Sequence, residues 1–163
     1  MKVICDVMLG KLSRYLRMLG LDAIYVSDAA RPGKWAGEDE PVLFLTRRQK
    51  RSCPERCVII ASERVEGQLK EIGPIIRPFL SRDRIMSRCI RCNVELAVAE
   101  KADVEQYVPE FVFHQYNEFK RCPCCNRVYW KGSHVRHMLG WIRDILGAEV
   151  ETLSKPSELN PAS

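Results

Sequence analysis

The sequence lacks an apolar run long enough to cross a membrane, which would need about 20 residues. It also lacks the apolar core of a signal peptide, because Asp6 lies within the stretch Met1 to Leu9, where that core would have to begin. We therefore expect a cytoplasmic protein without membrane contact. Secretion is not expected, so a framework of disulfides is not the expected use of the eight cysteines.

A strong excess of one charge is also missing. The chain has 26 lysines and arginines and 21 aspartates and glutamates, and its net charge of +5 favours no class of partner by itself. Its 163 residues, 46% of them hydrophobic, suffice for one ordinary core and a small metal-bound module, but not for two large domains. We expect a first domain at 1–84, a second unit at 85–147 and a flexible polar tail at 148–163.

Cysteines are present in pairs. Cys89 and Cys92 form one Cys-x-x-Cys pair, Cys122 and Cys125 form a second, and 29 residues lie between the pairs. Two such pairs are the usual ligand set of one tetrahedral zinc ion in a zinc ribbon. The alternatives are disulfides or a redox dithiol in a thioredoxin-like setting. The paired spacing favours a structural Zn²⁺ held by these four thiolates.

The remaining cysteines are not expected to bind the ion. Cys124 lies next to Cys125 and could compete for the metal, but the gap from Cys122 to Cys125 matches that of the first pair. We therefore interpret Cys124 as a bystander. Cys53 and Cys57 alone cannot close a zinc site, so we interpret them as ordinary thiols.

Short β-prone runs alternate with helical patterns in the first half of the chain. Strands are expected at residues 2–6, 22–26, 42–45 and 58–61. Leucines at helical spacing follow the first strand as far as Gly20, and a second helix is expected at about 65–72. Residues 29–41 indicate a loop with a short helix, and an amphipathic helix is expected at about 133–146. The alternation predicts an α/β fold with a parallel sheet flanked by helices.

Acidic residues are expected at the carboxyl ends of these strands, where open parallel sheets gather their reactive groups. Asp6 follows the first strand, Asp28 follows the second, and Glu40 arrives just before the third. Carboxylates from different strand ends suit Mg²⁺ or Mn²⁺, which activates water in phosphodiester cleavage. The alternative is that Asp6 caps the next helix and residues 38–40 form a solvated acidic turn.

Basic residues cluster in three segments of the sequence. Such clusters are usually solvated surface, but beside a zinc ribbon they favour a nucleic acid as the partner. The clusters are Lys11, Arg14 and Arg17; Arg47, Arg48, Lys50 and Arg51; and Arg82, Arg84, Arg88 and Arg91.

Aromatic residues follow the second cysteine pair. Tyr129 and Trp130 could stack on unpaired bases. The alternative for Trp130 is that it holds the ribbon against the first domain. Lys131 and His134 complete a candidate RNA-binding segment, with His134 facing solvent or phosphate at the start of a helix.

Two long stretches resemble the Mut-seven C-terminal RNase domain family. One is Asp6-Val7-Met8-Leu9-Gly10-Lys11-Leu12-Ser13-Arg14-Tyr15-Leu16-Arg17, which continues through Gly20 to Asp22. The other comprises the two cysteine pairs and the run Val128-Tyr129-Trp130-Lys131-Gly132-Ser133-His134. The likeness covers about residues 2–140, and the motifs occur in the same order as in the family.

The resemblance implies a PIN-like nuclease fold joined to a zinc ribbon, an RNA substrate and a divalent ion held by acidic residues. Asp6 matches the family's first acid, Glu40 its Glu before the third strand, and Asp28 an acid after the second strand. One position departs from the pattern: where the family has Thr-Arg-Asp, this chain has Arg48 as the last residue of the three. A guanidinium repels a divalent ion and attracts phosphate.

These features lead to a main hypothesis with two alternatives. The main hypothesis is a metal-dependent ribonuclease with catalytic Asp6, Asp28 and Glu40, and with RNA contacts from Lys11, Arg14, Arg17, Arg47, Arg48, Tyr129, Lys131 and His134. The first alternative is an RNA- or ribonucleoprotein-binding protein that kept the fold and lost the chemistry because of Arg48. The second makes the zinc ribbon a protein-interaction module.

Overall fold

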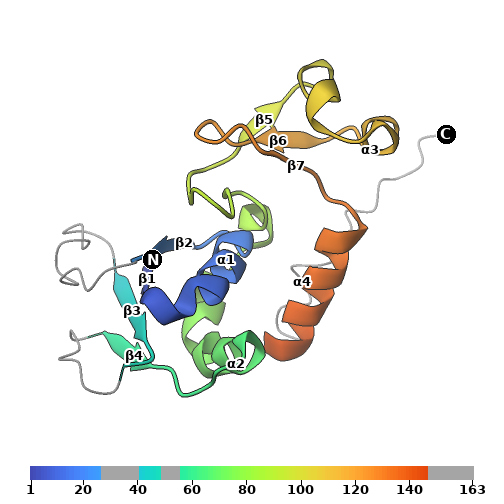
Figure 1. The fold of residues 1–163 in the computed structure, drawn as a ribbon. Coiled ribbons are helices and arrows are strands. Elements are labelled where there is room, and N and C mark those ends of the chain that lie inside the picture. Colours follow the sequence, from blue (N-terminus) through green and yellow to red (C-terminus); the bar gives the residue numbers. More distant parts are fainter. Residues whose placement is uncertain (27–40, 49–55, 147–163) are drawn as a thin grey trace.

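The computed structural model describes residues 1–26, 41–48 and 56–146. Within them, a four-stranded sheet and its helices form a first unit, a small three-stranded sheet forms the ribbon, and a long C-terminal helix follows (Figure 1). The predicted α/β architecture with a ribbon and a C-terminal helix is therefore confirmed. Residues 29–40 of the expected loop at 29–41, and the tail at 148–163, lie outside the described residues.

The larger sheet consists of β1 (Lys2–Cys5), β2 (Asp22–Tyr25), β3 (Val42–Thr46) and β4 (Cys57–Ile59). All three strand pairings are parallel, and the order is β2-β1-β3-β4. The central strands β1 and β3 read as continuous apolar runs because both of their faces are covered, which is typical of parallel sheets.

The strand order places a switch point between β1 and β3. The chain leaves β1 for β2 on one side and returns to β3 on the other, so the connections diverge between β1 and β3. In open parallel sheets, ligands bind at such a switch point, outside the carboxyl ends of the strands. Asp6 lies there, and its backbone N–H donates to the Leu45 carbonyl at 3.0 Å.

The first helical segment begins with the 3-10 turn η1 (Val7–Leu9) and continues as α1 (Gly10–Met18). Leu12 and Leu16 are fully buried under α1, while Lys11 and Arg14 are exposed on its other side. The helix ends as predicted before Gly20, which has a φ of 83°. A Cβ at Gly20 would lie 2.1 Å from the Arg84 carbonyl oxygen, so only glycine fits there.

The second helix, α2 (Val65–Ile76), runs past its expected end and through Pro74. It continues because Leu69, Ile72 and Ile76 are fully buried in the core of the first unit. Two 3-10 turns, η3 (Arg77–Phe79) and η4 (Arg82–Arg84), then lead to the ribbon.

The C-terminal helix α4 (Ser133–Leu146) follows the ribbon in sequence but packs on the first unit. Ile142 and Leu146 are buried in the same core as α1 and α2, and the rings of Tyr15 and Trp141 lie 5.3 Å apart. Figure 1 shows α4 standing beside α1 and α2. No helix in the described part of the chain is both long enough and apolar enough to span a bilayer.

The ribbon sheet has β6 (Phe119–Arg121) between β5 (Ala97–Ala99) and β7 (Val128–Tyr129), all antiparallel. Short helical segments that the sequence patterns did not predict connect β5 to β6: η5 (Lys101–Asp103), η6 (Glu105–Tyr107) and α3 (Glu110–Gln115).

The ribbon has a small hydrophobic core of its own, formed by Val104, Val112 and Phe119. Trp130 packs against this core, so the interpretation that it holds the ribbon against the first domain is wrong. Tyr129 instead packs against the core of the first unit.

Asn93 links the ribbon to the first unit. Its side-chain N–H donates to the Asp22 carboxylate at 2.6 Å, and its side-chain carbonyl accepts from the Ala23 backbone N–H at 3.2 Å. Both partners lie on β2, at the amino end of the parallel sheet. The ribbon is therefore attached at the edge opposite to that of Asp6.

Candidate functional site

Asp6 is a buried carboxylate at the carboxyl end of β1, with 1% of its surface exposed. One oxygen accepts a hydrogen bond from the Val7 backbone N–H, so Asp6 caps the turn that follows it, as one of the two sequence interpretations expected. The other oxygen accepts from the Thr46 hydroxyl at 2.7 Å. These contacts fix the orientation of the carboxylate at the switch point.

Arg48 supplies a positive charge to this carboxylate. Its Nε lies 3.6 Å from Asp6 Oδ2, and its backbone N–H donates to the Thr46 hydroxyl oxygen at 3.0 Å. The Arg48 side chain is 48% exposed, whereas that of Asp6 is 2% exposed. The positive charge of Arg48 would oppose the binding of a cation at the Asp6 carboxylate.

The other predicted catalytic acids, Asp28 and Glu40, lie outside the described residues. Within residues 1–26, 41–48 and 56–146, three or more potential metal ligands come together only at the cysteine cluster. Asp6 and its described neighbours therefore do not by themselves make up a site for Mg²⁺ or Mn²⁺. Thr46 links Asp6 to Arg48 through its hydroxyl group. In the sequence, only the position of Thr46 at the end of a strand indicated a place in the site.

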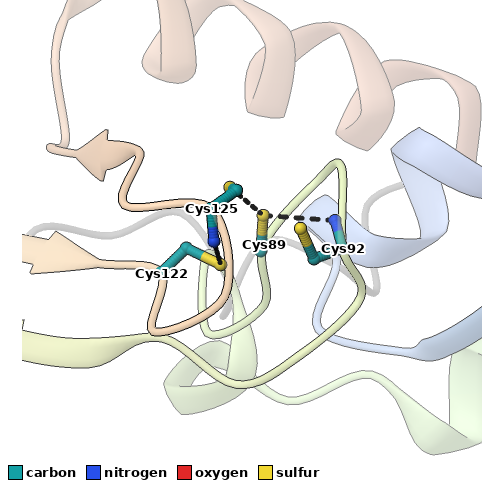
Figure 2. Close-up of side chains that lie close together, drawn as sticks. All are labelled: Cys89, Cys92, Cys122 and Cys125. Carbon is teal, nitrogen blue, oxygen red and sulfur yellow. Dashed lines mark hydrogen bonds between the residues drawn. The ribbon is translucent and has the colours of Figure 1, made fainter.

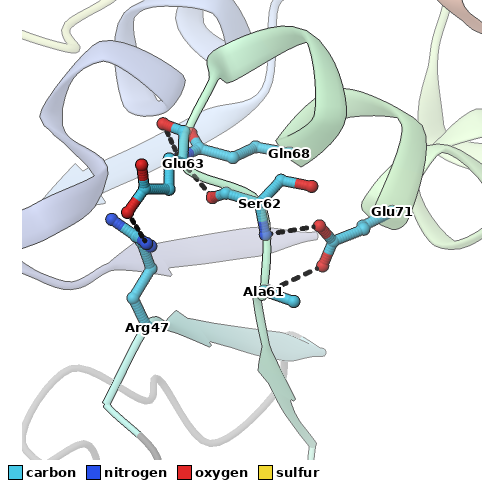
Figure 3. A network of polar contacts seen from close by, with 6 residues as sticks. All are labelled: Arg47, Ala61, Ser62, Glu63, Gln68 and Glu71. Carbon is cyan, nitrogen blue, oxygen red and sulfur yellow. Dashed lines mark hydrogen bonds and ion pairs between the residues drawn. The ribbon is translucent and has the colours of Figure 1, made fainter.

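Further polar residues lie where β3 and β4 end (Figure 3). The Arg47 guanidinium pairs with Glu63 at 3.4 Å, and the Glu63 side chain is 86% exposed. Glu71 of α2 reaches back to the segment after β4 and accepts from the backbone N–H groups of Ala61 at 2.9 Å and Ser62 at 2.8 Å. Glu71 therefore holds this segment in place beside Arg47.

We expect Glu71→Gln to lower the melting temperature at neutral pH by about 2–4 °C. Burial alone raises the pKa of Glu71, but hydrogen bonds from Ser62 and Ala61 bring the pKa below its ordinary value of 4.5. This stabilisation is present above the unfolded-state pKa and is lost as the pH falls through the folded-state pKa. The difference in melting temperature should therefore shrink as the pH falls through the folded-state pKa of Glu71. A constant difference at all pH values would contradict this role.

The four predicted zinc ligands come together in the ribbon (Figure 2). The sulfur atoms of Cys89, Cys92, Cys122 and Cys125 all lie within 4.8 Å of one another, and those of Cys89 and Cys125 are 3.7 Å apart. Tetrahedral zinc with Zn–S bonds of about 2.3 Å separates its sulfurs by about 3.8 Å. The four-cysteine cluster could therefore bind Zn²⁺.

The two cysteine turns have the same backbone geometry. The N–H of Cys92 donates to Cys89 Sγ at 3.3 Å, and the N–H of Cys125 donates to Cys122 Sγ at 3.4 Å. Each turn ends in an asparagine with positive φ: 66° at Asn93 and 58° at Asn126. Asparagine tolerates this left-handed conformation better than most residues, so an asparagine after each pair was a readable signal of two equivalent turns.

The electrostatics of the cluster favour a bound cation. Burial raises the pKa of the Cys89 thiol, but hydrogen bonds from Tyr129 and from the Cys92 backbone outweigh it and lower the pKa to about 6. A hydrogen bond with Cys125 raises the pKa of Cys92, and burial raises that of Cys122. Zinc binds cysteine as the thiolate, so zinc binding at this cluster would be linked to the release of protons from its thiols.

Tyr129 lies against this cluster, with its hydroxyl 3.1 Å from Cys89 Sγ. We expect Tyr129→Phe to weaken zinc binding about 10- to 100-fold, because partners of metal ligands commonly contribute that much. Competition between the protein and a chromogenic chelator measures the affinity. An unchanged affinity in a folded variant would contradict the role of the hydroxyl.

The other cysteines differ in their states. Cys124 is exposed and is not among the four clustered residues, which supports its interpretation as a bystander. Cys57 is disulfide-bonded, so its interpretation as an ordinary thiol is wrong. Cys53 lies outside the described residues.

The predicted RNA contacts fall into two groups. Lys11, Arg14, Lys131 and His134 are exposed. Arg17 is 8% exposed, and its guanidinium donates to the carbonyls of Ala23 at 2.8 Å and of Ile90 and Arg91 at 2.9 Å.

Arg17 therefore ties the first cysteine turn to the first unit, which leaves it unsuited to the phosphate contact expected from the sequence. Tyr129 is likewise half-buried and in contact with Cys89. Charge and ring type in the sequence did not reveal these buried partners.

A family model for the Mut7-C RNAse domain matches residues 1–142, which include the carboxyl edge of the sheet and the whole ribbon. The chain belongs to the Mut7-C RNase domain family. This membership suggests a ribonuclease. No curated protein and no solved structure matches the chain significantly.

Proposed function

We propose that this Mut7-C RNase domain is a metal-dependent ribonuclease whose reaction takes place at the carboxyl edge of the parallel sheet. The observation that supports the proposal most strongly is the position of Asp6, a buried, oriented carboxylate at the switch point of a domain from a ribonuclease family. Burial of a carboxylate costs free energy, and such residues are concentrated at functional sites.

In this proposal, Asp6 holds Mg²⁺ or Mn²⁺ together with Asp28 and Glu40 from outside the described residues. Such an ion, when bound, activates water and neutralises phosphate charge. Thr46 keeps the Asp6 carboxylate oriented through its 2.7 Å hydrogen bond. Arg48 balances the charge of Asp6, and its half-exposed guanidinium would contact an RNA phosphate where Asp6 holds the cation.

The RNA backbone is bound in this proposal by Lys11 and Arg14 of α1 and by Arg47 and Arg48 after β3. Lys11 and Arg14 are exposed and belong to the helix that begins at the Asp6 edge. The ribbon, with zinc as a structural ion, contributes Lys131 and His134 as a second RNA surface. Phosphate contacts of this kind weaken as the salt concentration rises.

A cleavage assay with labelled single-stranded and structured RNA tests the proposal. The protein is loaded with zinc, freed of other metals and assayed with and without Mg²⁺ or Mn²⁺. We expect cleavage only with an added divalent ion, and zinc alone serves as the control. Cleavage that is equally fast without Mg²⁺ or Mn²⁺ would contradict the proposal.

The Arg48–Asp6 ion pair favours a second candidate, an RNA-binding protein that has lost catalysis. If the protein is a ribonuclease, we expect Arg48→Asp to lower the Mn²⁺ concentration for half-maximal cleavage about tenfold. The reason is that a carboxylate, which attracts Mn²⁺, replaces a guanidinium, which repels it. Arg82→Asp is the matched control, because Arg82 is exposed on η4 and is not among the proposed RNA contacts. An inactive natural protein beside an active Arg48→Asp variant would identify the binding protein.

A further inference from the structure

The ribbon has a cavity of about 420 Å³ that the reaction at Asp6 does not use. This volume falls within the roughly 300–1,000 Å³ typical of sites that enclose a small organic molecule or group. The cavity adjoins one face of the ribbon sheet and the segment that leads into α4. It is therefore distinct from the carboxyl edge of the parallel sheet.

One part of the cavity lining is a cross-strand row on that face. Val98 pairs with Lys120, and Lys120 pairs with Tyr129, so the three side chains point to the same side of the sheet. Val98 is 82% exposed, the most exposed of the large apolar side chains in the described part of the chain. Trp130 and Met86 add apolar surface to the wall. These side chains line one cavity together with Val98, and a continuous apolar surface of this kind is typical of a binding site.

The cavity lining also carries groups of the kinds that bind a nucleotide. Lys101, Lys120 and Lys131 contribute three positive charges, against the two negative charges of Glu100 and Glu118. The ammonium group of Lys101 is held by the Asn117 side chain at 2.8 Å, and that of Lys120 lies 3.5 Å from the Met86 carbonyl. The lysines suit a phosphate, while amide and carboxylate groups suit the edges of a base.

We propose that this cavity binds one unstacked nucleotide of a single-stranded RNA, with the base against the apolar wall and the phosphate at the lysines. This inference rests on the proposed function, because the strand that supplies the nucleotide is the RNA substrate. Base edges and faces are accessible only where a strand is unpaired, so the cavity selects single strands over duplexes.

The test measures binding of a fluorescent single-stranded oligoribonucleotide to the full zinc-loaded chain, without Mg²⁺ or Mn²⁺ so that the probe stays intact. Val98→Glu places a negative charge in the cavity mouth at a position where the exposed side chain contributes little to folding. We expect affinity to fall about tenfold, within the range caused by loss of one base contact. A blunt RNA duplex, measured in parallel, should lose less than about twofold.

Two matched variants separate the cavity from general charge effects. Val98→Lys changes the same position with the opposite charge and should bind the single strand at least as well as the natural protein. Phe111→Glu adds the same negative charge at a 66% exposed position on α3, outside the cavity, and should bind normally. Zinc content and melting temperature verify that each variant is folded.

Normal single-strand affinity in Val98→Glu would overturn the inference. An equal loss of affinity in Phe111→Glu would also overturn it. In either case the cavity would not be an RNA site, and a protein would become the candidate ligand. These failures are separate from failure of the ribonuclease proposal. Metal-dependent cleavage with no effect of Val98→Glu on binding rejects the cavity alone. If Val98→Glu lowers single-strand affinity but the natural protein never cleaves RNA, only the ribonuclease proposal is rejected.

Discussion

Asp6→Asn is expected to reduce Mn²⁺-dependent RNA cleavage by at least about 100-fold, because loss of a metal-binding carboxylate removes several kcal/mol of transition-state stabilisation. The substitution changes charge but not shape. The amide that replaces the carboxylate keeps one oxygen, which can still accept the Val7 backbone hydrogen bond, so the cap of the following turn survives. The rate of single-turnover cleavage at saturating protein measures the effect on chemistry rather than on RNA binding.

Asp22→Asn is the matched control for this experiment. Asp22 is also a carboxylate at a strand end, but it accepts from Asn93 at the amino edge of the sheet, away from Asp6. Its substitution should leave cleavage within about twofold of the natural rate. Equal activity of the natural protein and folded Asp6→Asn would remove Asp6 from the mechanism.

Cys122→Ser is expected to abolish stoichiometric zinc binding and to unfold the ribbon. Structural zinc sites contribute about 10–16 kcal/mol of apparent binding free energy, which also stabilises the folded module. The ribbon depends on this contribution because its own core has few buried side chains, chiefly Val104, Val112 and Phe119. Zinc content by elemental analysis and amide hydrogen exchange across residues 86–131 measure both effects.

The first unit should remain folded in this variant, because α1, α2 and α4 share a separate and larger core. Cys124→Ser is the matched control: Cys124 is exposed and lies outside the four-cysteine cluster, so one zinc per chain should remain. Full zinc content in Cys122→Ser, or its loss in Cys124→Ser, would contradict the assignment of the four ligands.

The parallel sheet could be predicted because its strands are short apolar runs separated by helical periodicity. Val3, Ile4 and Cys5 are all fully buried, as expected of a strand covered on both faces. The end of α2 was not predictable in the same way, since Pro74 normally signals a stop and only the buried face of the helix explains its continuation. The packing of α4 on the first unit is likewise a tertiary contact that helical spacing does not specify.

The zinc ligands could be predicted because both cysteine pairs have a spacing set by the turn itself. Arg17 shows the opposite case. Its charge suggested a phosphate contact, but its guanidinium is occupied by three carbonyls, two of them from the distant first cysteine turn. Tyr129 similarly looked like a stacking residue, whereas its hydroxyl contacts Cys89. A residue type states what a side chain can bind, and only the fold determines which partner it meets.

The central claim is that Asp6 binds a divalent cation in competition with Arg48. Anomalous scattering from crystals soaked with Mn²⁺ tests it most directly, because zinc and manganese are distinguished by their absorption edges. We predict zinc at the four cysteine sulfurs and manganese at the Asp6 carboxylate, with Arg48 turned away from its present 3.6 Å contact. No manganese at Asp6, with Arg48 still on the carboxylate in crystals of a protein that cleaves RNA, would contradict the account.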